Sequence, residues 1–331
     1  AQALGIDPAA VTIHPTLVGG GFGRRLETDY GVTAALIARK LGRPVKVIWS
    51  REQDSLQARL RPAAATRFIG AFDREGRLTY LGSQTACVDR EPRVRGLRDI
   101  PYGVPFRVVR YSAGEPFGRC GQWRSVDLSQ NTFFLESFID ECAAASASDP
   151  LDFRRMLLAH DPRSSRVLDT LERLCDWRNA RRDGRHLGMA FLQGFDSISA
   201  QAVQVEVTPK GGVRVRRVFV VVDCGTAVNP RNVAAQVEGG VLFGLSAALA
   251  EEVTIVGGEI QQHNFDAYRL LSMSQSAQVT VEILESPDAP IGGVGELGVP
   301  PVAPALANAL YAATGNRVRR LPLTRSGSLT A

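Results

Sequence analysis

The fold of the first part of the chain is decided by one stretch, Val18-Gly19-Gly20-Gly21-Phe22-Gly23-Arg24-Arg25. An alternating apolar run over 11–18 precedes it and predicts a strand, while Thr28 and Asp29 can cap a helix that ends near Leu41. Glycines on such a turn let backbone N–H groups approach a ligand closely, and the helix N-terminus adds partial positive charge. The neighbouring arginines carry forked donors that suit an oxyanion. The stretch therefore predicts an anion-binding loop.

A second apolar run, over 45–49, predicts a strand that completes a strand–loop–helix–strand unit. Such a unit is typical of dinucleotide-binding folds, and Glu52 lies roughly where a ribose-binding acid would lie. Gly19 and Gly21 fit the first two glycines of the dinucleotide fingerprint, but Arg24 takes the place of the third. Two interpretations stay open here: a nicotinamide-dependent dehydrogenase that uses the 18–25 loop, and a plain glycine turn with surface arginines.

Composition describes an ordinary globular chain of 331 residues, 44% hydrophobic and 22% charged, with material for one large domain or two. Its net charge of +5 is mixed along the sequence, and the basic clusters at 178–185 and 317–325 contain no aromatic residues, so we expect no nucleic-acid partner. Its five cysteines include no C-x-x-C pair, which argues against an iron–sulfur or zinc site within this chain. No apolar run predicts a membrane span.

The periodicities along the chain alternate between those of strands and helices and predict an α+β fold, with mixed sheets and packed helices. Asp149 and Pro150 mark one helix start, and Asn229 and Pro230 open a glycine-rich helical stretch. We expect a hairpin of 67–72 and 77–88, a short strand at 108–112, an apolar helix around 133–139, helices at 150–159, 164–178, 233–249 and after 301, and strands at 202–207, 213–222, 252–255 and 278–284.

A second glycine-rich loop, Gly292-Gly293-Val294-Gly295-Glu296-Leu297-Gly298, carries a carboxylate just before a predicted helix. Glycines keep side chains away from Glu296, so a ligand atom can approach the carboxylate and use it as a general base. The alternative is a glutamate at a helix start, which the helix dipole favours.

Three further positions could bind a ligand. Arg124, in the loop Trp123-Arg124-Ser125, could bind an anion or form a salt bridge within the protein. Gln201, after Ala200, and Gln236 lie in apolar surroundings, where an amide needs a backbone or cofactor partner.

Together, these segments resemble the molybdenum-binding large subunits of the xanthine oxidase family, in particular its isoquinoline 1-oxidoreductase-like and aldehyde dehydrogenase-like branch. The resemblance is carried by the 19–25 loop, by Trp123-Arg124-Ser125 before Phe133-Phe134-Leu135-Glu136-Ser137-Phe138, by 222–239, and by Gly293-Val294-Gly295-Glu296 before Pro300-Pro301. These blocks occur in the family's order and span nearly the whole chain.

The resemblance implies a molybdenum hydroxylase that oxidises an N-heteroaromatic or aldehyde carbon with water as oxygen donor, and with Glu296 as the general base. It implies two molybdopterin-binding domains, 1–185 and 186–331. The cofactor is expected to be molybdenum-molybdopterin cytosine dinucleotide, with the metal held by the pterin rather than by protein ligands. Cofactor contacts are expected from Gly20, Gly21, Phe22, Gly23, Arg24, Arg124, Ala200, Gln201 and Gln236, and substrate-pocket contacts from Leu26 and Trp123.

Two departures from the family pattern matter. Leu26 stands where purine-oxidising relatives have a substrate-binding glutamate, so purine oxidation is disfavoured, and the family's Glu-Met-Gly-Gln-Gly segment is absent. The chain also begins without Met or a signal peptide. We expect it to be the later part of a longer precursor or of a split subunit.

Several partners are implied by the resemblance: the N-terminal portion of the large subunit, a small subunit with [2Fe–2S] clusters, and a cytochrome c or another electron acceptor. The family branch leans towards a periplasmic location, including the periplasmic side of the membrane, with a cytoplasmic location as the alternative. A further alternative is an assembly subunit that keeps the fold without the chemistry.

Overall fold

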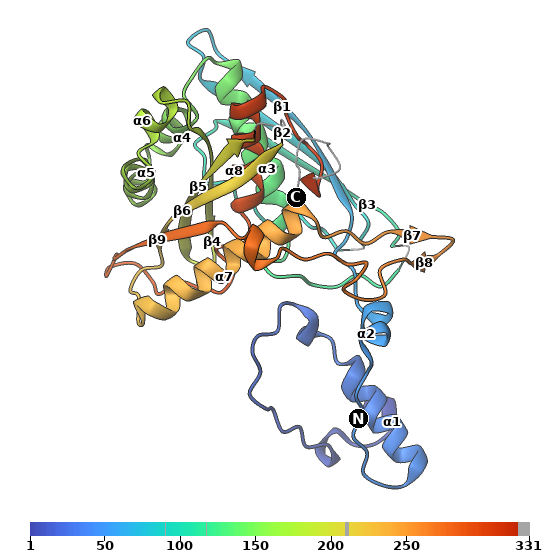
Figure 1. Ribbon diagram of the computed structural model, residues 1–331. Coiled ribbons are helices and arrows are strands. Elements are labelled where there is room, and N and C mark those ends of the chain that lie inside the picture. The colour runs from blue at the N-terminus through green and yellow to red at the C-terminus, as the bar shows by residue number, and fades with distance from the viewer. Residues whose placement is uncertain (90, 117, 209–211, 324–331) are drawn as a thin grey trace.

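The computed structural model describes residues 1–89, 91–116, 118–208 and 212–323 and has an α+β architecture with two mixed sheets and packed helices (Figure 1). The predicted fold class is confirmed. The helices are α1 Asp29–Leu41, α2 Arg51–Gln57, α3 Leu128–Ala145, α4 Pro150–Leu158, α5 Pro162–Leu174, α6 Trp177–Arg182, α7 Pro230–Leu249 and α8 Val302–Thr314. The strands are β1 Ala64–Phe72, β2 Leu78–Cys87, β3 Phe106–Ala113, β4 His186–Gly194, β5 Ser197–Val207, β6 Val213–Asp223, β7 Ile255–Val256, β8 Glu259–Ile260 and β9 Gln278–Leu284.

The first sheet has the order β1-β2-β3 and contains the predicted hairpin. β1 and β2 pair antiparallel across a turn in which Asp73 accepts hydrogen bonds from the backbone N–H groups of Glu75 (3.0 Å) and Arg77 (2.9 Å). β3 joins the other side of β2 in parallel, because the chain crosses over between them through 88–105. α3 packs against β1 and continues the core towards the second sheet.

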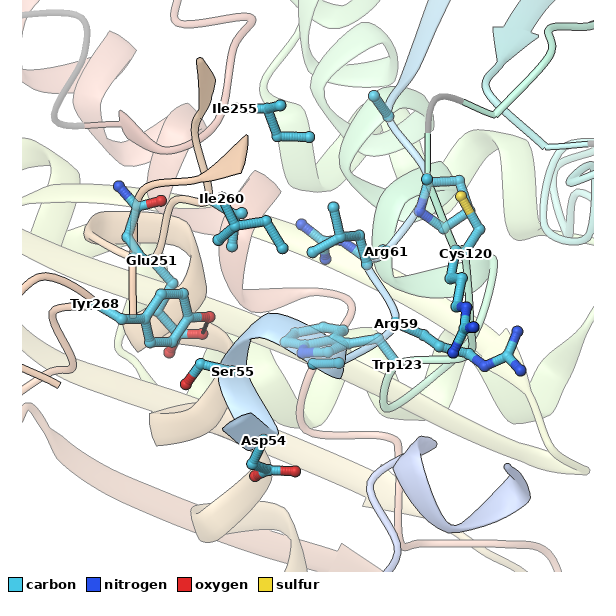
Figure 2. Close-up of a pocket in the computed structure, with 18 of the residues that line it drawn as sticks. Asp54, Ser55, Arg59, Arg61, Cys120, Trp123, Glu251, Ile255, Ile260 and Tyr268 are labelled. Atoms are coloured by element: carbon cyan, nitrogen blue, oxygen red, sulfur yellow. Dashed lines mark hydrogen bonds between the residues drawn. The ribbon is translucent and has the colours of Figure 1, made fainter. Parts of the chain in front are cut away.

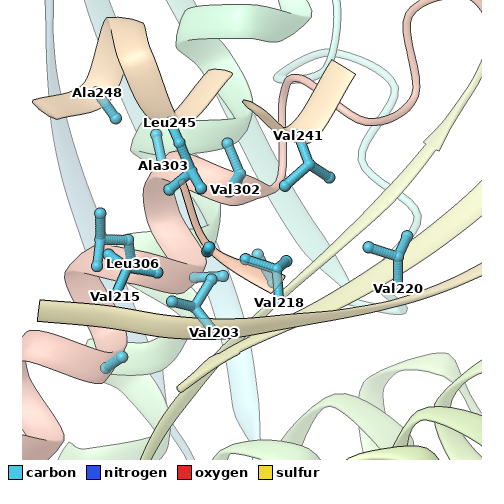
Figure 3. Packing of buried hydrophobic residues seen from close by; sticks show 14 of the residues in the cluster. Val203, Val215, Val218, Val220, Val241, Leu245, Ala248, Val302, Ala303 and Leu306 are labelled. Atoms are coloured by element: carbon cyan, nitrogen blue, oxygen red, sulfur yellow. The ribbon is translucent and has the colours of Figure 1, made fainter. Parts of the chain in front are cut away.

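The second sheet has the order β4-β5-β6-β9, with β9 parallel to β6 and the other neighbours antiparallel. Side chains alternate between its two faces, as the pleat requires. Val203 and Val218 point to the face covered by α7 and α8, where they meet Leu245, Val302 and related apolar residues (Figure 3). Ala202 and Val221 point to the opposite face, which packs on α5. The sheet is therefore covered on both faces.

Two predicted strands are wrong. The runs at 11–18 and 45–49 have no regular secondary structure, and they pair with no strand in the described part of the chain. Leu17 and Ile48 are 104% and 77% exposed, so these runs have neither hydrogen-bonded neighbours nor a core to face. The helix between them is confirmed as α1, which Gly42 ends in a left-handed conformation. Because both strands are missing, the strand–loop–helix–strand unit of a nicotinamide dehydrogenase is not formed.

Two other predicted elements have different boundaries in the structure. The helix expected at 164–178 is divided into α5 and α6 by Asp176, whose left-handed backbone (φ 52°) interrupts the helical hydrogen bonds. The strand expected at 252–255 is reduced to the two residues of β7.

Glu296 lies in a loop six residues before α8, so it is not at the start of that helix. The domain boundary at 185 stays a prediction; α5, from before it, packs on β5 and β6 after it.

Candidate functional site

Arg124 joins segments that lie far apart in the sequence. Its Nε donates to the carbonyl oxygen of Gly295 at 2.7 Å, and its Nη2 donates to the backbone and side-chain oxygens of Gln236 at 3.3 and 3.4 Å. The neighbouring Ser125 hydroxyl donates to the carbonyl oxygen of Glu296 at 2.8 Å. The structure therefore brings together three predicted site residues, Arg124, Gln236 and Glu296, from different elements.

The glycine loop packs against the same group through Phe22. The Phe22 ring lies 5.6 Å from the ring of Phe243, measured between centroids, and Phe243 stacks on Trp123 at 4.8 Å. The Arg124 guanidinium carbon lies 5.7 Å from the Phe22 ring centroid and 5.6 Å from that of Phe243. These contacts place Phe22, Trp123 and Arg124 around one aromatic residue of α7.

Phe243 is the site residue that sequence reasoning missed. It follows Gln236 by seven residues on α7, so two helical turns place both side chains on one face. That spacing could have identified Phe243 once Gln236 was taken as a site residue.

Gly23 allows the glycine loop to touch the loop that carries Arg124. Its backbone has φ +95°, and a Cβ atom there would lie 2.1 Å from the carbonyl oxygen of Gln122. The Phe22 backbone is also left-handed (φ 50°), as are those of Ser125 (φ 77°) and Val126 (φ 51°) in the facing loop. Non-glycine residues in this conformation are strained, and such strain concentrates at functional sites.

Gln201 supports the Glu296 loop from β5. Its side chain is fully buried, and its Nε2 donates to the carbonyl oxygen of Gly298 at 3.0 Å. Its Oε1 has no hydrogen-bond partner among the described residues. Ala200 beside it is also fully buried. The amide nitrogen of Gln201 thus has the predicted backbone partner, and its oxygen can still accept a hydrogen bond from a further group.

Glu296 is half-buried, and its carboxylate interacts electrostatically with the Arg124 guanidinium. Burial lowers the pKa of the Arg124 guanidinium, and the nearby Glu296 carboxylate opposes that shift. Glu296 is therefore a carboxylate near a partly buried cation, in a loop whose other residues are mostly glycines.

Arg24 has a structural role in the described fold. It forms an ion pair with Asp29 at 2.9 Å and lies over the rings of Tyr30 and Trp49, with 5.8 and 5.9 Å to their centroids. The hydrogen bond from Arg24 is the main cause that lowers the pKa of Asp29. These contacts secure the glycine loop on α1. Leu26, at the end of the same loop, is 70% exposed.

A cavity of about 560 Å³ lies behind Trp123, bounded by α2, the 58–63 segment and the β7–β8 hairpin (Figure 2). The Arg61 guanidinium carbon lies 4.6 Å from the Trp123 ring centroid, and Tyr268 donates from its hydroxyl to Glu251 at 2.8 Å. Of the predicted site residues, Trp123 alone lines this cavity. Trp123 therefore lines this cavity and also stacks on Phe243, which the Phe22 ring contacts.

Two family models match the chain, both described as a molybdopterin cofactor-binding domain. One covers residues 1–88, which contain the Gly20–Gly23 loop, and the other covers 178–276, which contain Gln201, Gln236 and Phe243.

Curated relatives align over 98% of the chain. It is 35% identical to the isoquinoline 1-oxidoreductase subunit beta of Brevundimonas diminuta, of which the chain covers 44%. It is 30% identical to the membrane-bound aldehyde dehydrogenase (pyrroloquinoline-quinone) of Gluconacetobacter polyoxogenes, of which it covers 47%. The chain thus spans about half the length of the curated relatives it matches.

Solved structures share the fold at low sequence identity. Quinoline 2-oxidoreductase from Pseudomonas putida 86 superposes with a TM-score of 0.77 at 16% identity, over 92% of this chain and 66% of that one. The aldehyde oxidoreductase from Desulfovibrio desulfuricans gives a TM-score of 0.78 at 16% identity, over 92% and 52%. Fold and matched domains define a molybdopterin-binding protein. More closely, the chain belongs to the molybdenum-binding large subunits of the xanthine oxidase family.

The residues present fit a molybdopterin cofactor. The backbone N–H groups of Gly20, Gly21, Phe22 and Gly23 donate to no group among the described residues, and the φ angles of Gly20, Phe22 and Gly23 are positive. Successive N–H groups in turn conformations can bind anionic oxygen or sulfur groups. The unpaired Gln201 Oε1 offers an acceptor. No cluster of three or more His, Cys, Asp or Glu side chains is present in the described part of the chain.

Proposed function

We propose that this chain forms part of the catalytic large subunit of a molybdenum hydroxylase, which oxidises an N-heteroaromatic or aldehyde carbon with water as the oxygen donor. The observation that carries the proposal is the contact of Arg124 with Gly295 and Gln236, beside Phe22. It joins the glycine loop and the Glu296 loop into one site within a fold shared with aldehyde and quinoline oxidoreductases.

The roles follow from chemistry and position. When bound, the molybdenum cofactor supplies the two-electron redox chemistry. The N–H groups of 20–23, the Arg124 side chain and the Gln201 amide would hold it. Glu296 accepts the proton released as the new carbon–oxygen bond forms, since its carboxylate lies in a loop of small residues that a substrate can reach. Trp123 and Leu26 would border the substrate.

Glu296→Gln tests the proposed base. The amide keeps the size of the side chain but cannot accept a proton, so turnover should fall by about two to four orders of magnitude with the molybdenum content unchanged. Turnover of benzaldehyde and quinoline, followed by reduction of a redox dye, measures the effect on the assembled enzyme. Glu238→Gln, on the exposed surface of α7, is the matched control and should keep full turnover.

Two results would contradict this role. Full turnover by the molybdenum-loaded Glu296→Gln enzyme would exclude Glu296 as the base. A wild-type enzyme that is purified without molybdenum and oxidises neither probe would favour the alternative of a non-catalytic assembly subunit.

The cofactor and partners are part of the same proposal. The relatives named as subunits or large subunits support an enzyme of several chains. We expect the cytosine dinucleotide form of the cofactor, the remaining portion of the large subunit, a small [2Fe–2S] subunit and a cytochrome c or other acceptor. Nucleotide analysis of the released cofactor and iron content of the co-purified subunits test these expectations.

The location of the enzyme is proposed to be periplasmic, including association with the periplasmic side of the membrane. The name of the membrane-bound relative supports this proposal. None of the described helices has the length and apolar character needed to cross a membrane. Fractionation of cells with an activity stain would test the location.

A further inference from the structure

Asp223, the last residue of β6, is a fully buried carboxylate held by two arginines. Its Oδ1 accepts a hydrogen bond from Arg163 at 2.7 Å, and its Oδ2 accepts one from Arg166 at 2.8 Å. Both arginines come from α5, and Arg166 also donates to the carbonyl oxygen of Glu285 at 2.9 Å. The carboxylate therefore connects the end of the central strand to a helix and to the segment after β9.

The same carboxylate organises the backbone on both sides of it. Asp223 Oδ1 accepts from the N–H of Gly225 at 3.1 Å, and Oδ2 accepts from the Ser286 hydroxyl at 2.6 Å. The N–H of Ser286 then donates to the carbonyl oxygen of Gly225 at 3.0 Å. The 223–225 turn and the beginning of the 286–292 segment are thus held as one unit.

The far end of that segment is attached to the same turn. The N–H of Gly292 donates to the carbonyl oxygen of Cys224 at 2.9 Å, and the N–H of Gly293 donates to that of Phe195 at 2.7 Å. Gly225 lies so close to Pro290 that a Cβ atom would be 2.3 Å from the Pro290 carbonyl oxygen. The chain is therefore fixed from Ser286 to Gly293, and Glu296 follows three residues later.

We infer that Asp223, together with Arg163, Arg166 and Ser286, is a positioning group that sets the place of the Glu296 carboxylate through the 286–293 segment. The inference rests on the proposed role of Glu296 as the base. Asp223 itself touches neither Glu296 nor Arg124 in the described contacts, so its effect on the reaction is indirect. Misplacement of a reacting group by about 1 Å can cost about a hundredfold in rate.

The hydrogen bonds around Asp223 require a side chain with two acceptor oxygens, which an ionised carboxylate supplies. An asparagine has the same shape, but its amide nitrogen is a donor and would face either Arg166 and Ser286 or Arg163 and the Gly225 N–H. The first orientation loses the hydrogen bond from the Ser286 hydroxyl, and the second loses the one from Gly225, in the turn that holds Ser286 and Gly292. The segment should therefore loosen while the hydrophobic core around β6 stays in place.

Asp223→Asn and Ser286→Ala, made in the assembled enzyme, test the inference. We expect kcat for benzaldehyde or quinoline to fall by about tenfold to a hundredfold, with KM and molybdenum content within about twofold of wild type. In a Glu296→Gln background the same changes should cause no further loss, because the group that they position is already absent. Ser276→Ala, a hydroxyl on the exposed 272–276 turn, is the control.

Hydrogen exchange supplies a readout that needs no turnover. The amides of Gly292 and Gly293 should exchange faster in Asp223→Asn and Ser286→Ala, whereas those of β5 should not change. Equal losses of kcat with and without Glu296, or unchanged exchange at 292–293, would overturn the inference. If Glu296→Gln alone leaves turnover intact, the proposed function fails, and the exchange data still decide whether Asp223 holds the loop. Ser286→Ala gives the same decision if Asp223→Asn does not fold.

Discussion

Glu136 and Arg154 form an ion pair in which both side chains are almost completely buried. Arg154 Nε lies 2.9 Å from Glu136 Oε2, and the carboxylate also accepts hydrogen bonds from the Tyr102 hydroxyl (2.6 Å) and the Phe191 N–H (2.8 Å). α3, α4 and β4 meet at this group. A buried carboxylate that has a counter-charge and accepts three hydrogen bonds is tolerated, but it becomes costly when one partner is removed.

Arg154→Met should therefore destabilise the fold by about 3–5 kcal/mol, because Glu136 would be left buried without its counter-charge. Arg319→Met removes a partner of Glu141 at a largely exposed position and should cost at most about 1 kcal/mol. The difference would be measured as the apparent free energy of unfolding in urea, followed by tryptophan fluorescence. Equal costs for the two variants would contradict the assignment of Glu136 as a buried charge that depends on Arg154.

Asp223 makes the stability of the fold depend on pH in the acid range. Burial alone would raise the pKa of its carboxyl group, but hydrogen bonds from Arg163, Ser286, Gly225 and Arg166 outweigh it and lower the pKa to about 2. A carboxylate with a lowered pKa contributes stability above its ordinary pKa near 4, and this contribution is lost as the pH falls towards 2.

The free energy of unfolding of the wild type should thus exceed that of Asp223→Asn by about 2 kcal/mol at pH 7. This difference should shrink between pH 4 and pH 2. Urea unfolding at several pH values checks the trend. A difference that stays constant down to pH 2 would show that the charge of Asp223 is not what stabilises the fold.

At the scale of elements, the site depends on one loop-to-loop contact. The glycine loop before α1 meets the Gln122–Trp123 backbone at Gly23, and the Phe22 ring reaches α7 through Phe243. Both glycine-rich loops were expected near the cofactor from sequence. Their contact with the Arg124 loop was not, because it depends on how the loops cross.

Gly23→Ala should disturb this contact, since an alanine with φ +95° is strained by about 1–3 kcal/mol and its Cβ atom would overlap Gln122. We expect a lower molybdenum content per assembled enzyme, measured by elemental analysis. Gly31→Ala in α1, where a Cβ atom has open space, should leave the metal content unchanged and improve helix stability by at most about 1 kcal/mol. Equal molybdenum in both variants would exclude the proposed packing at Gly23.

At the scale of the whole molecule, no residue is buried in the first part of the chain, from 1 to 77, and 1–57 of it precede the first sheet. Figure 1 shows this segment, with α1 and α2, extending away from the two sheets. Exposed large apolar side chains of this kind mark an interaction surface. They are Ile6, Ile13, Leu17, Val18, Phe22, Leu26, Tyr30, Val32, Leu36, Ile37, Leu41, Ile48 and Leu56.

We expect the remaining portion of the large subunit to cover this surface. Leu36→Asp, at a position of α1 that is 45% exposed, should then reduce the yield of assembled enzyme, because the carboxylate would be buried on assembly. Met156→Asp, at a position of α4 that is 43% exposed, controls for the added negative charge and should assemble normally. Size-exclusion chromatography of the co-expressed subunits distinguishes them, and normal assembly of Leu36→Asp would refute a buried α1 face.

The sequence by itself determined the fold class, most of the helices and the hairpin, and it predicted residues for a site. Local periodicity predicted them wherever one face of an element meets a core, as in α3, α7 and β6. It failed at 11–18 and 45–49, because an alternating apolar run forms a strand only when another strand supplies hydrogen bonds to it. Periodicity within one segment contains no information about that partner.

Only the tertiary structure decided which predicted residues act together. Arg124, Gln236 and Gly295 are separated by 112 and 171 positions along the chain, and their contact depends on the packing of α7 against the loop before α8. The tertiary structure also revealed Phe243 and linked the buried charge of Asp223 to the 286–293 segment before Glu296. Side-chain identity is local, whereas the proximity that turns side chains into a site is created by long-range packing.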